Sequence, residues 1–189
     1  DAPAALAAIG SAASILEGRV AFAREISVVA ARGLDGAIAA YDPGENRHED
    51  GVLRETVVPA AISAERAAEA RAVAADILEA LDYVGVIGVE LFDAQGPLVV
   101  NEIAPRVHNS GHWTTDACLI DQFEQHVRAV AGWPLGDGSR HSDAVMQNLL
   151  GPEIGGAPLV AGAAVHVYDK REPRPGRKMG HITRIAPRR

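Results

Sequence analysis

Glu90 and Glu102 are the two residues whose type and spacing most clearly suggest chemistry. If they oppose each other on adjacent strands, their Cβ atoms lie about 4.5–5.5 Å apart. Two like charges at that distance repel unless one carboxylate is protonated or a cation lies between them. Carboxylates near substrate phosphates are the usual ligands of Mg²⁺ in proteins. The pair therefore predicts a magnesium site, and the alternative is two solvated carboxylates on a hairpin.

The two glutamates meet if residues 84–92 and 98–103 form a β-hairpin. Both runs are rich in β-forming residues, and the intervening Asp-Ala-Gln-Gly-Pro has the composition of a turn. A three-residue loop at 95–97 makes Phe92 oppose Val100, and it makes the two glutamates oppose each other. Because side chains alternate between the faces of a strand, a register shifted by one residue would separate the pair.

A dense polar segment follows the hairpin, with the sequence Asn-Glu-Ile-Ala-Pro-Arg-Val-His-Asn-Ser-Gly-His-Trp at 101–113. Arg106 offers a planar fork for phosphate or carboxylate oxygens, and His108 and Asn109 can donate and accept hydrogen bonds. Gly111 allows close approach of the backbone. The segment predicts a binding loop, and the alternative is a polar surface loop.

A second charged segment lies near the C-terminus between two β-rich runs. Its basic residues fall within nine positions and are Lys170, Arg171, Arg174, Arg177 and Lys178. Because the rest of the chain is acidic, this local cluster favours a clamp on a substrate phosphate. The alternative is a solvated basic turn.

The composition narrows the class of protein. The chain has 189 residues, 48% of them hydrophobic, and a formal net charge of −7, which argues against a general nucleic-acid binder. No run approaches the roughly 20 apolar residues of a membrane span. The single cysteine, Cys118, is predicted to be buried and fits a reducing cytoplasm. Because the sequence begins without Met or a basic leader, we expect it to start partway through a longer protein.

Periodicity predicts the elements around these segments. We expect one helix from an N-cap at Ser63 to Asp82, and a second from about Thr115 to Gly132 with His126 on its solvated face. The apolar stripe of the second helix is expected to be Ile120, Phe123, Val127 and Val130. The remaining strands are expected at 14–16, 24–29, 37–41, 145–150, 165–168 and 180–185.

Together these motifs resemble the ATP-grasp ligases, and within them the 5-(carboxyamino)imidazole ribonucleotide synthases. The resemblance is carried by the paired glutamates with the 101–113 segment, by residues 25–36, and by Tyr168-Asp-Lys with Arg-Pro-Gly-Arg-Lys-Met-Gly-His at 174–181. It implies an α+β fold: the C-terminal half of an ATP-grasp fold, an antiparallel sheet with helices, plus a small β-rich C-terminal domain. It further implies that 1–24 ends a lid subdomain, that 25–136 binds metal and ATP, and that 137–189 is an incomplete β-rich domain carrying the basic hairpin.

The resemblance also implies roles for individual residues. Glu90 and Glu102 would be the metal ligands and would act in catalysis with Arg106, which lies near the reacting phosphate. The implied ATP contacts are Glu17, Gly18, Arg19, Val20, Glu25, His48, Asn101 and Glu102. The implied contacts to aminoimidazole ribonucleotide are His108 and Asn109, with Lys170 and Arg177 on its phosphate.

The implied reaction uses ATP and Mg²⁺ or Mn²⁺ to activate bicarbonate as carboxyphosphate and then carboxylates aminoimidazole ribonucleotide in purine biosynthesis. The family also suggests a cytoplasmic homodimer that hands its product to a downstream mutase. Because the family's lysines and glycine-rich lid precede the part matched here, we expect this chain alone to be inactive. The alternatives are another ATP-grasp carboxylase or formyl-transferring ligase, and a non-catalytic nucleotide-binding module.

Overall fold

The fold is that of a computed structural model, which describes residues 2–10 and 12–189. Within these residues the strands form one sheet in the order β6-β5-β1-β3-β4-β7-β9-β8, with β2 paired to β1, and each pairing is antiparallel. The strands are β1 (Arg24–Arg32), β2 (Ile38–Ala40), β3 (Gly44–Glu49), β4 (Val52–Val58), β5 (Gly85–Asp93), β6 (Val99–Ala104), β7 (Ser142–Leu150), β8 (Ala164–Val167) and β9 (Lys178–Pro187). The helices are α1 (Ala2–Ala8), α2 (Ala64–Ala80), η1 (Asn109–Gly111), α3 (Thr114–Ala117), α4 (Gln122–Ala131) and η2 (Gly151–Leu159).

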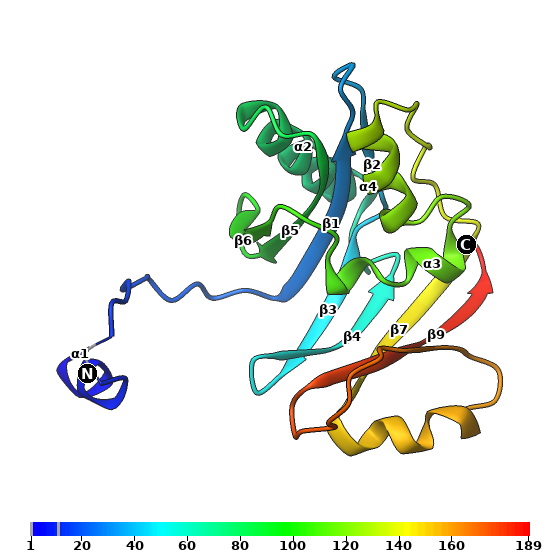
Figure 1. The fold of residues 1–189 in the computed structure, drawn as a ribbon. Helices are drawn as coiled ribbons and strands as arrows, with labels where there is room; N and C mark the ends of the chain where they lie inside the picture. The colour runs from blue at the N-terminus through cyan, green and yellow to red at the C-terminus, as the bar shows by residue number, and fades with distance from the viewer. Residues whose placement is uncertain (1, 11) are drawn as a thin grey trace.

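Helix α2 covers one face of β1 and β5 (Figure 1). The hydroxyl of Ser63 accepts a hydrogen bond from the Arg66 backbone N–H, so the predicted N-cap is confirmed. Ala70, Ala74 and Leu78 recur at a spacing of four residues and are fully buried. Because strand side chains alternate, they pack against one side-chain set of the sheet, which includes Ile26, Val28, Ile87 and Val89.

The opposite face of β1 and β5 is covered by the segment that runs from η1 through α3 to α4 (Figure 1). Val29 and Val86 pack there against Trp113 and Ala117. Cys118 is buried in the same cluster, as the sequence predicts. This face also carries Glu90, because it lies four residues after Val86 on the same strand.

Two expectations about secondary structure are wrong, and so is one about the orientation of a helix side chain. Residues 14–16 form no strand; Ile15 and Leu16 lie in an extended, exposed segment that, with α1, projects away from the sheet and has no partner strand (Figure 1). The predicted second helix is two helices, because the Asp121 side chain accepts hydrogen bonds from the backbone N–H groups of Phe123 and Glu124 and so caps the start of α4. His126 is not on a solvated face, since its Nδ1 accepts a hydrogen bond from the Val86 N–H at 3.0 Å.

The expected apolar stripe of α4 also faces outward. Phe123, Val127 and Val130 are each roughly half exposed, whereas the buried residues of this helix are Gln122, Gln125 and Ala129. The helix therefore turns two amide side chains toward the protein interior.

None of the helices in the described residues is long and apolar enough to cross a membrane.

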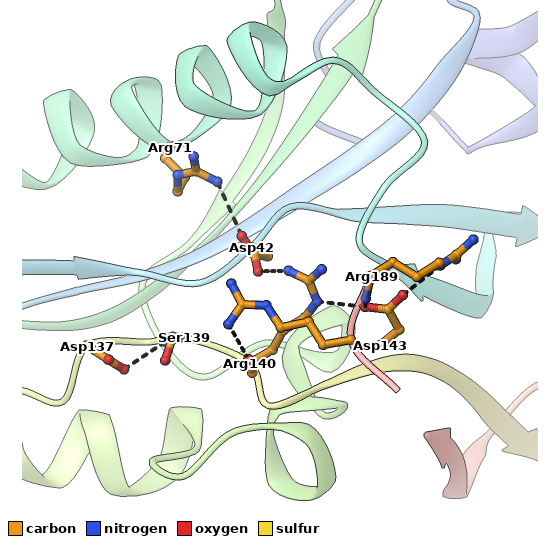
Figure 2. Close-up of polar contacts among 8 residues, drawn as sticks. Asp42, Arg71, Asp137, Ser139, Arg140, Asp143 and Arg189 are labelled. Atoms are coloured by element: carbon orange, nitrogen blue, oxygen red, sulfur yellow. Dashed lines mark hydrogen bonds and ion pairs between the residues drawn. The ribbon is translucent and has the colours of Figure 1, made fainter. Parts of the chain in front are cut away.

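The sheet continues across the expected boundary near residue 137, because β4 pairs with β7. Buried Arg140 spans this junction: it contacts Asp42 through Nη1 and Asp143 through Nε at 3.0 Å (Figure 2). Arg71 on α2 reaches Asp42 at 3.4 Å, and Arg189 reaches Asp143 at 2.9 Å. The charge network thus links α2, the β2–β3 connection, the start of β7 and the end of the chain.

Candidate active site

The hairpin of β5 and β6 places Glu90 directly opposite Glu102, as predicted. The register predicted next to the turn is wrong, because Phe92 opposes Val99 rather than Val100. A bulge at Asn101 adds one residue to β6 and compensates for the shifted turn, which returns both glutamates to the same face.

The two glutamates lie in a pocket of about 410 Å³ on the sheet face opposite α2. Residues of β1, β3, β4, β5, β6 and β9 line it, with others from the β3–β4 turn and the loop after β6. Its lining residues are Glu25, His48, Gly51, Leu53, Glu90, Asn101, Glu102, Arg106, His108 and Lys178.

Glu90 is the most buried carboxylate of the pocket. Its side chain is 13% exposed, and burial raises its pKa; nearby Glu102 and Glu25 raise it further, against the opposing effect of His48 and Lys178. One ligand atom each from Glu90, Glu102 and His108 lies within 4.8 Å of the others. Hard oxygen donors that repel each other fit a divalent cation such as Mg²⁺, because the ion removes the repulsion.

His108 approaches the pair from the loop after β6. Its Nε2 lies 3.7 Å from Glu90 Oε1, and its Nδ1 lies 2.8 Å from the hydroxyl of Ser110. Burial, followed by the charges of Arg106 and Lys178, lowers its pKa to about 4, so it is a neutral imidazole at neutral pH. The approach requires Gly88, because a Cβ there would lie 2.5 Å from the Cβ of His108.

Gln122 at the start of α4 holds the His108 backbone in place. Its Oε1 accepts from the His108 N–H and its Nε2 donates to the His108 carbonyl, both at 2.8 Å. The same Nε2 lies 2.9 Å from Nδ1 of His112. Gln122 is fully buried, and the sequence analysis missed it, because a polar residue on an amphipathic helix is ordinarily solvated.

Glu25 and His48 form a second polar pair within the pocket. Glu25 lies on β1 and His48 on β3, and a carboxylate oxygen of Glu25 contacts Nδ1 of His48. Arg106 is exposed, and its Nη1 donates to the Val107 carbonyl at 2.9 Å. The pocket thus contains the carboxylates of Glu25, Glu90 and Glu102 together with the cationic groups of Arg106 and Lys178.

Lys178 is the residue of the basic segment that reaches the pocket. Burial lowers its pKa, while Glu90 raises it. Lys170 supports it from outside, since its Nζ donates to the Lys178 carbonyl at 2.6 Å, and Arg177 instead donates to the Glu172 carbonyl at 3.1 Å. The strand expected at 180–185 begins two residues earlier in the structure, at Lys178, so this lysine is part of β9 and lies beside the pocket.

Several residues with implied roles lie outside this pocket. Lys170, Arg177 and Asn109 do not line it, although Nδ2 of Asn109 is buried with no hydrogen-bond partner among the described residues. The segment 17–20 lies in the extended stretch before β1 and also contributes nothing to the pocket (Figure 1).

Comparison with known proteins matches the first two thirds of the chain to a family model. The model described as the ATP-grasp domain covers residues 1–123. The chain belongs to the ATP-grasp family. The antiparallel sheet with helices on it is the α+β architecture expected of that family. A second model, described as the phosphoribosylaminoimidazole carboxylase C-terminal domain, matches residues 144–189 of this ATP-grasp chain.

Individual relatives agree with these matches. The N5-carboxyaminoimidazole ribonucleotide synthase of Brucella melitensis is 56% identical over 188 residues, which are 97% of this chain and 52% of that protein. The crystal structure of the synthetase from Thermus thermophilus has a TM-score of 0.89 at 46% identity and covers 98% of this chain and 52% of that one. The Aspergillus clavatus enzyme, solved in complex with ADP and 5-aminoimidazole ribonucleotide, has a TM-score of 0.83 at 31% identity and covers 88% and 48%. The chain thus spans about half the length of the curated relatives it matches.

Proposed function

We propose that this chain supplies the metal- and substrate-binding half of an ATP-dependent carbon–nitrogen ligase that carboxylates 5-aminoimidazole ribonucleotide. The observation that carries the proposal is the opposed pair of Glu90 and Glu102 in one pocket with Arg106 and Lys178. The relatives support this choice of reaction, since they are named N5-carboxyaminoimidazole ribonucleotide synthases.

Glu90 and Glu102 would hold Mg²⁺ or Mn²⁺, whose charge offsets that of the nucleotide phosphates. Arg106 would add a second positive charge beside the transferred phosphoryl group. The Glu25–His48 pair would contact the nucleotide together with Asn101, and 17–20 would lie along its adenine edge. Catalysis in such a site is positioning plus electrostatic stabilisation.

The proposed reaction proceeds in two steps. A bicarbonate oxygen takes the γ-phosphoryl group of ATP, which gives carboxyphosphate and ADP. The exocyclic amine of the ribonucleotide then attacks the carboxyl carbon, phosphate leaves and the amine loses a proton. Neutral His108, beside Asn109, can accept or donate a hydrogen bond at that amine. Lys170 and Arg177 would bind the substrate phosphate together with Lys178, which lines the pocket and whose carbonyl accepts from Lys170.

We also propose that the assembled ligase is a cytoplasmic homodimer that passes its product to a downstream mutase. Cys118 is buried, and a single buried thiol is compatible with a reducing compartment. The exposed apolar residues Phe123, Val127 and Val130 of α4 offer a face that a second copy would cover. Sedimentation of the assembled ligase would test this, because a monomer at micromolar concentration would contradict it.

A chimera tests the proposed reaction. This chain replaces the matching 188 residues of the Brucella melitensis synthase, with which it is 56% identical. We expect phosphate release from ATP that requires both bicarbonate and aminoimidazole ribonucleotide, and none from the 189-residue chain alone. A folded chimera that binds ATP without such release would favour a non-catalytic nucleotide-binding module, and release with a different acceptor would favour another ATP-grasp ligase.

Two variants of the chimera test the site. Glu102→Ala should abolish turnover and leave the fold intact, and near-normal activity at saturating Mg²⁺ would contradict its role as a ligand. Lys178→Ala should raise KM for the ribonucleotide far more than for ATP. Arg177→Ala is the matched comparison, because its guanidinium donates to the Glu172 carbonyl and does not line the pocket, so its effect on this KM should be smaller. Equal effects of the two changes would mean that both residues contact the phosphate to the same extent.

A further inference from the structure

A second group of metal-type ligands lies apart from the pocket of Glu90 and Glu102. It comprises Asp116 on α3, His166 on β8 and His181 on β9. None of the three lines that pocket, and one ligand atom of each lies within 4.8 Å of the others. The register of the sheet pairs the two histidines directly, so the fold holds both imidazoles beside α3.

Asp116 and His166 already have the spacing of two ligands on one ion. Nε2 of His166 lies 3.0 and 3.1 Å from the two carboxylate oxygens. Two ligands bound tetrahedrally at about 2.0–2.1 Å from Zn²⁺ lie about 3.3 Å from each other. An ion can therefore enter between these side chains with a small outward movement of each.

His181 supplies the observation that points to a ligand. It is 4% exposed, and its Nε2 is buried without a hydrogen-bond partner among the described residues. Its Nδ1 lies 2.7 Å from the hydroxyl of Tyr168. In the tautomer that donates from Nδ1 to this oxygen, the Nε2 lone pair is left unpaired, which is how histidine ligands of metals are usually oriented. Burial, with His112 and His166 nearby, lowers its pKa to about 3, so the ring is neutral.

We propose that Asp116, His166 and His181 bind a transition-metal dication of the Zn²⁺ class, with water in the fourth position. Two imidazoles and one carboxylate suit Zn²⁺ or Co²⁺, whereas the two carboxylates of the pocket suit Mg²⁺. The two rings are stacked with centroids 4.4 Å apart, so His166, the more exposed of the pair, turns its ring to share the ion. The bound ion joins α3 to the β8–β9 hairpin, whose second strand begins with Lys178.

Titration of the full 189-residue chain with Co²⁺ tests the site, because tetrahedral Co²⁺ absorbs visible light strongly and octahedral Co²⁺ does so weakly. We expect a visible band that saturates at one equivalent and is removed by added Zn²⁺. His166→Gln and Asp116→Asn should each weaken Co²⁺ binding at least tenfold. Both residues are partly exposed, so the variants should fold, and circular dichroism checks this.

Two control variants separate this site from other ligands. His141→Gln changes an exposed histidine whose ring contacts Ser142, and Glu102→Gln disrupts the other candidate metal group. Both should keep the band. Zn²⁺ should also raise the Tm of the unmodified chain, and this rise should disappear in His166→Gln. The proposal is overturned if no band forms, if the band survives both His166→Gln and Asp116→Asn, or if Glu102→Gln removes it.

Discussion

Replacing Gln122 with leucine should loosen the loop that positions His108. The side chain makes hydrogen bonds to the N–H and the carbonyl of His108 and to the ring of His112. Leucine has a similar volume but cannot form any of them. The His108 backbone groups would then be buried without partners, because this residue is 8% exposed.

The expected cost follows from these lost partners. Each buried polar group left without a hydrogen bond costs about 1–3 kcal/mol, so two main-chain groups predict a loss of about 3 kcal/mol in the free energy of unfolding. For a chain of this size that corresponds to a fall in Tm of about 6–12 °C. The loop can relax toward water, so the value lies toward the lower end of the summed range.

Gln125 offers a matched control on the same helix. It is also fully buried, and its side chain pairs with the N–H and carbonyl of Gly136 at 2.9 and 2.8 Å, away from the pocket. Gln125→Leu should also destabilise the chain, but somewhat less, because Gly136 is half-buried. Gln125→Leu should leave the position and the pKa of His108 unchanged.

The deciding measurement is the pKa of His108 by NMR titration of its ring signals. Burial lowers this pKa to about 4, so a loosened and more hydrated loop should raise it toward the ordinary value of 6.5 in Gln122→Leu and leave it unchanged in Gln125→Leu. The reasoning is refuted if Gln122→Leu costs less than about 1 kcal/mol, the lower bound for one unsatisfied group. It is also refuted if both variants shift the His108 titration equally.

Three further predictions concern the pocket and its surroundings. Glu90→Gln should raise the Tm of the metal-free chain at pH 7 and remove its stabilisation by Mg²⁺, because burial raises the pKa of this carboxyl and disfavours its charged form. Gly88→Ala should destabilise the chain by about 1–3 kcal/mol through the clash with His108. Stability should fall as pH drops from 6.5 toward 4, because burial lowers the pKa of His108 and His112 to about 4 and the unfolded chain binds protons first.

Each of these has a measurement that decides it. Thermal melts with and without Mg²⁺ test Glu90→Gln, and a lower Tm without metal would contradict the prediction. Urea unfolding tests Gly88→Ala against Gly155→Ala, whose added methyl group meets nothing within 4 Å. Urea midpoints between pH 7 and 4 test the acid effect, and a flat profile over that range would exclude neutral buried histidines.

Local sequence patterns were enough to predict those helices and strands whose caps and periodicity lie within the element itself. Ser63 and the apolar spacing after it predict α2, because a side-chain cap and one buried face are properties of a single helix. The alternation of β5 predicts that Glu90 shares a face with Val86 and Gly88. The paired glutamates were also found this way, although the shifted turn and the bulge at Asn101 cancelled each other.

Contacts between segments far apart in the sequence could not be predicted from local patterns. Gln122 and His126 sit among apolar residues of α4, and only the loop and strand beneath them show that these polar side chains face inward. Residues 14–16 have strand composition but no partner, and a strand without a partner leaves its backbone groups to water.

The sequence by itself therefore determined the acidic pair, the polar loop after it and the basic segment as candidates, because residue type and short spacing define each of them. The tertiary structure decided which members meet. Pairing of β9 with β7 brings Lys178, rather than Arg177, to the pocket, and pairing of β8 with β9 places His166 beside His181. A tight turn fixes the register of a hairpin locally, but the connections that join β7, β8 and β9 are longer, so the packing of the sheet decides which residues of these strands pair.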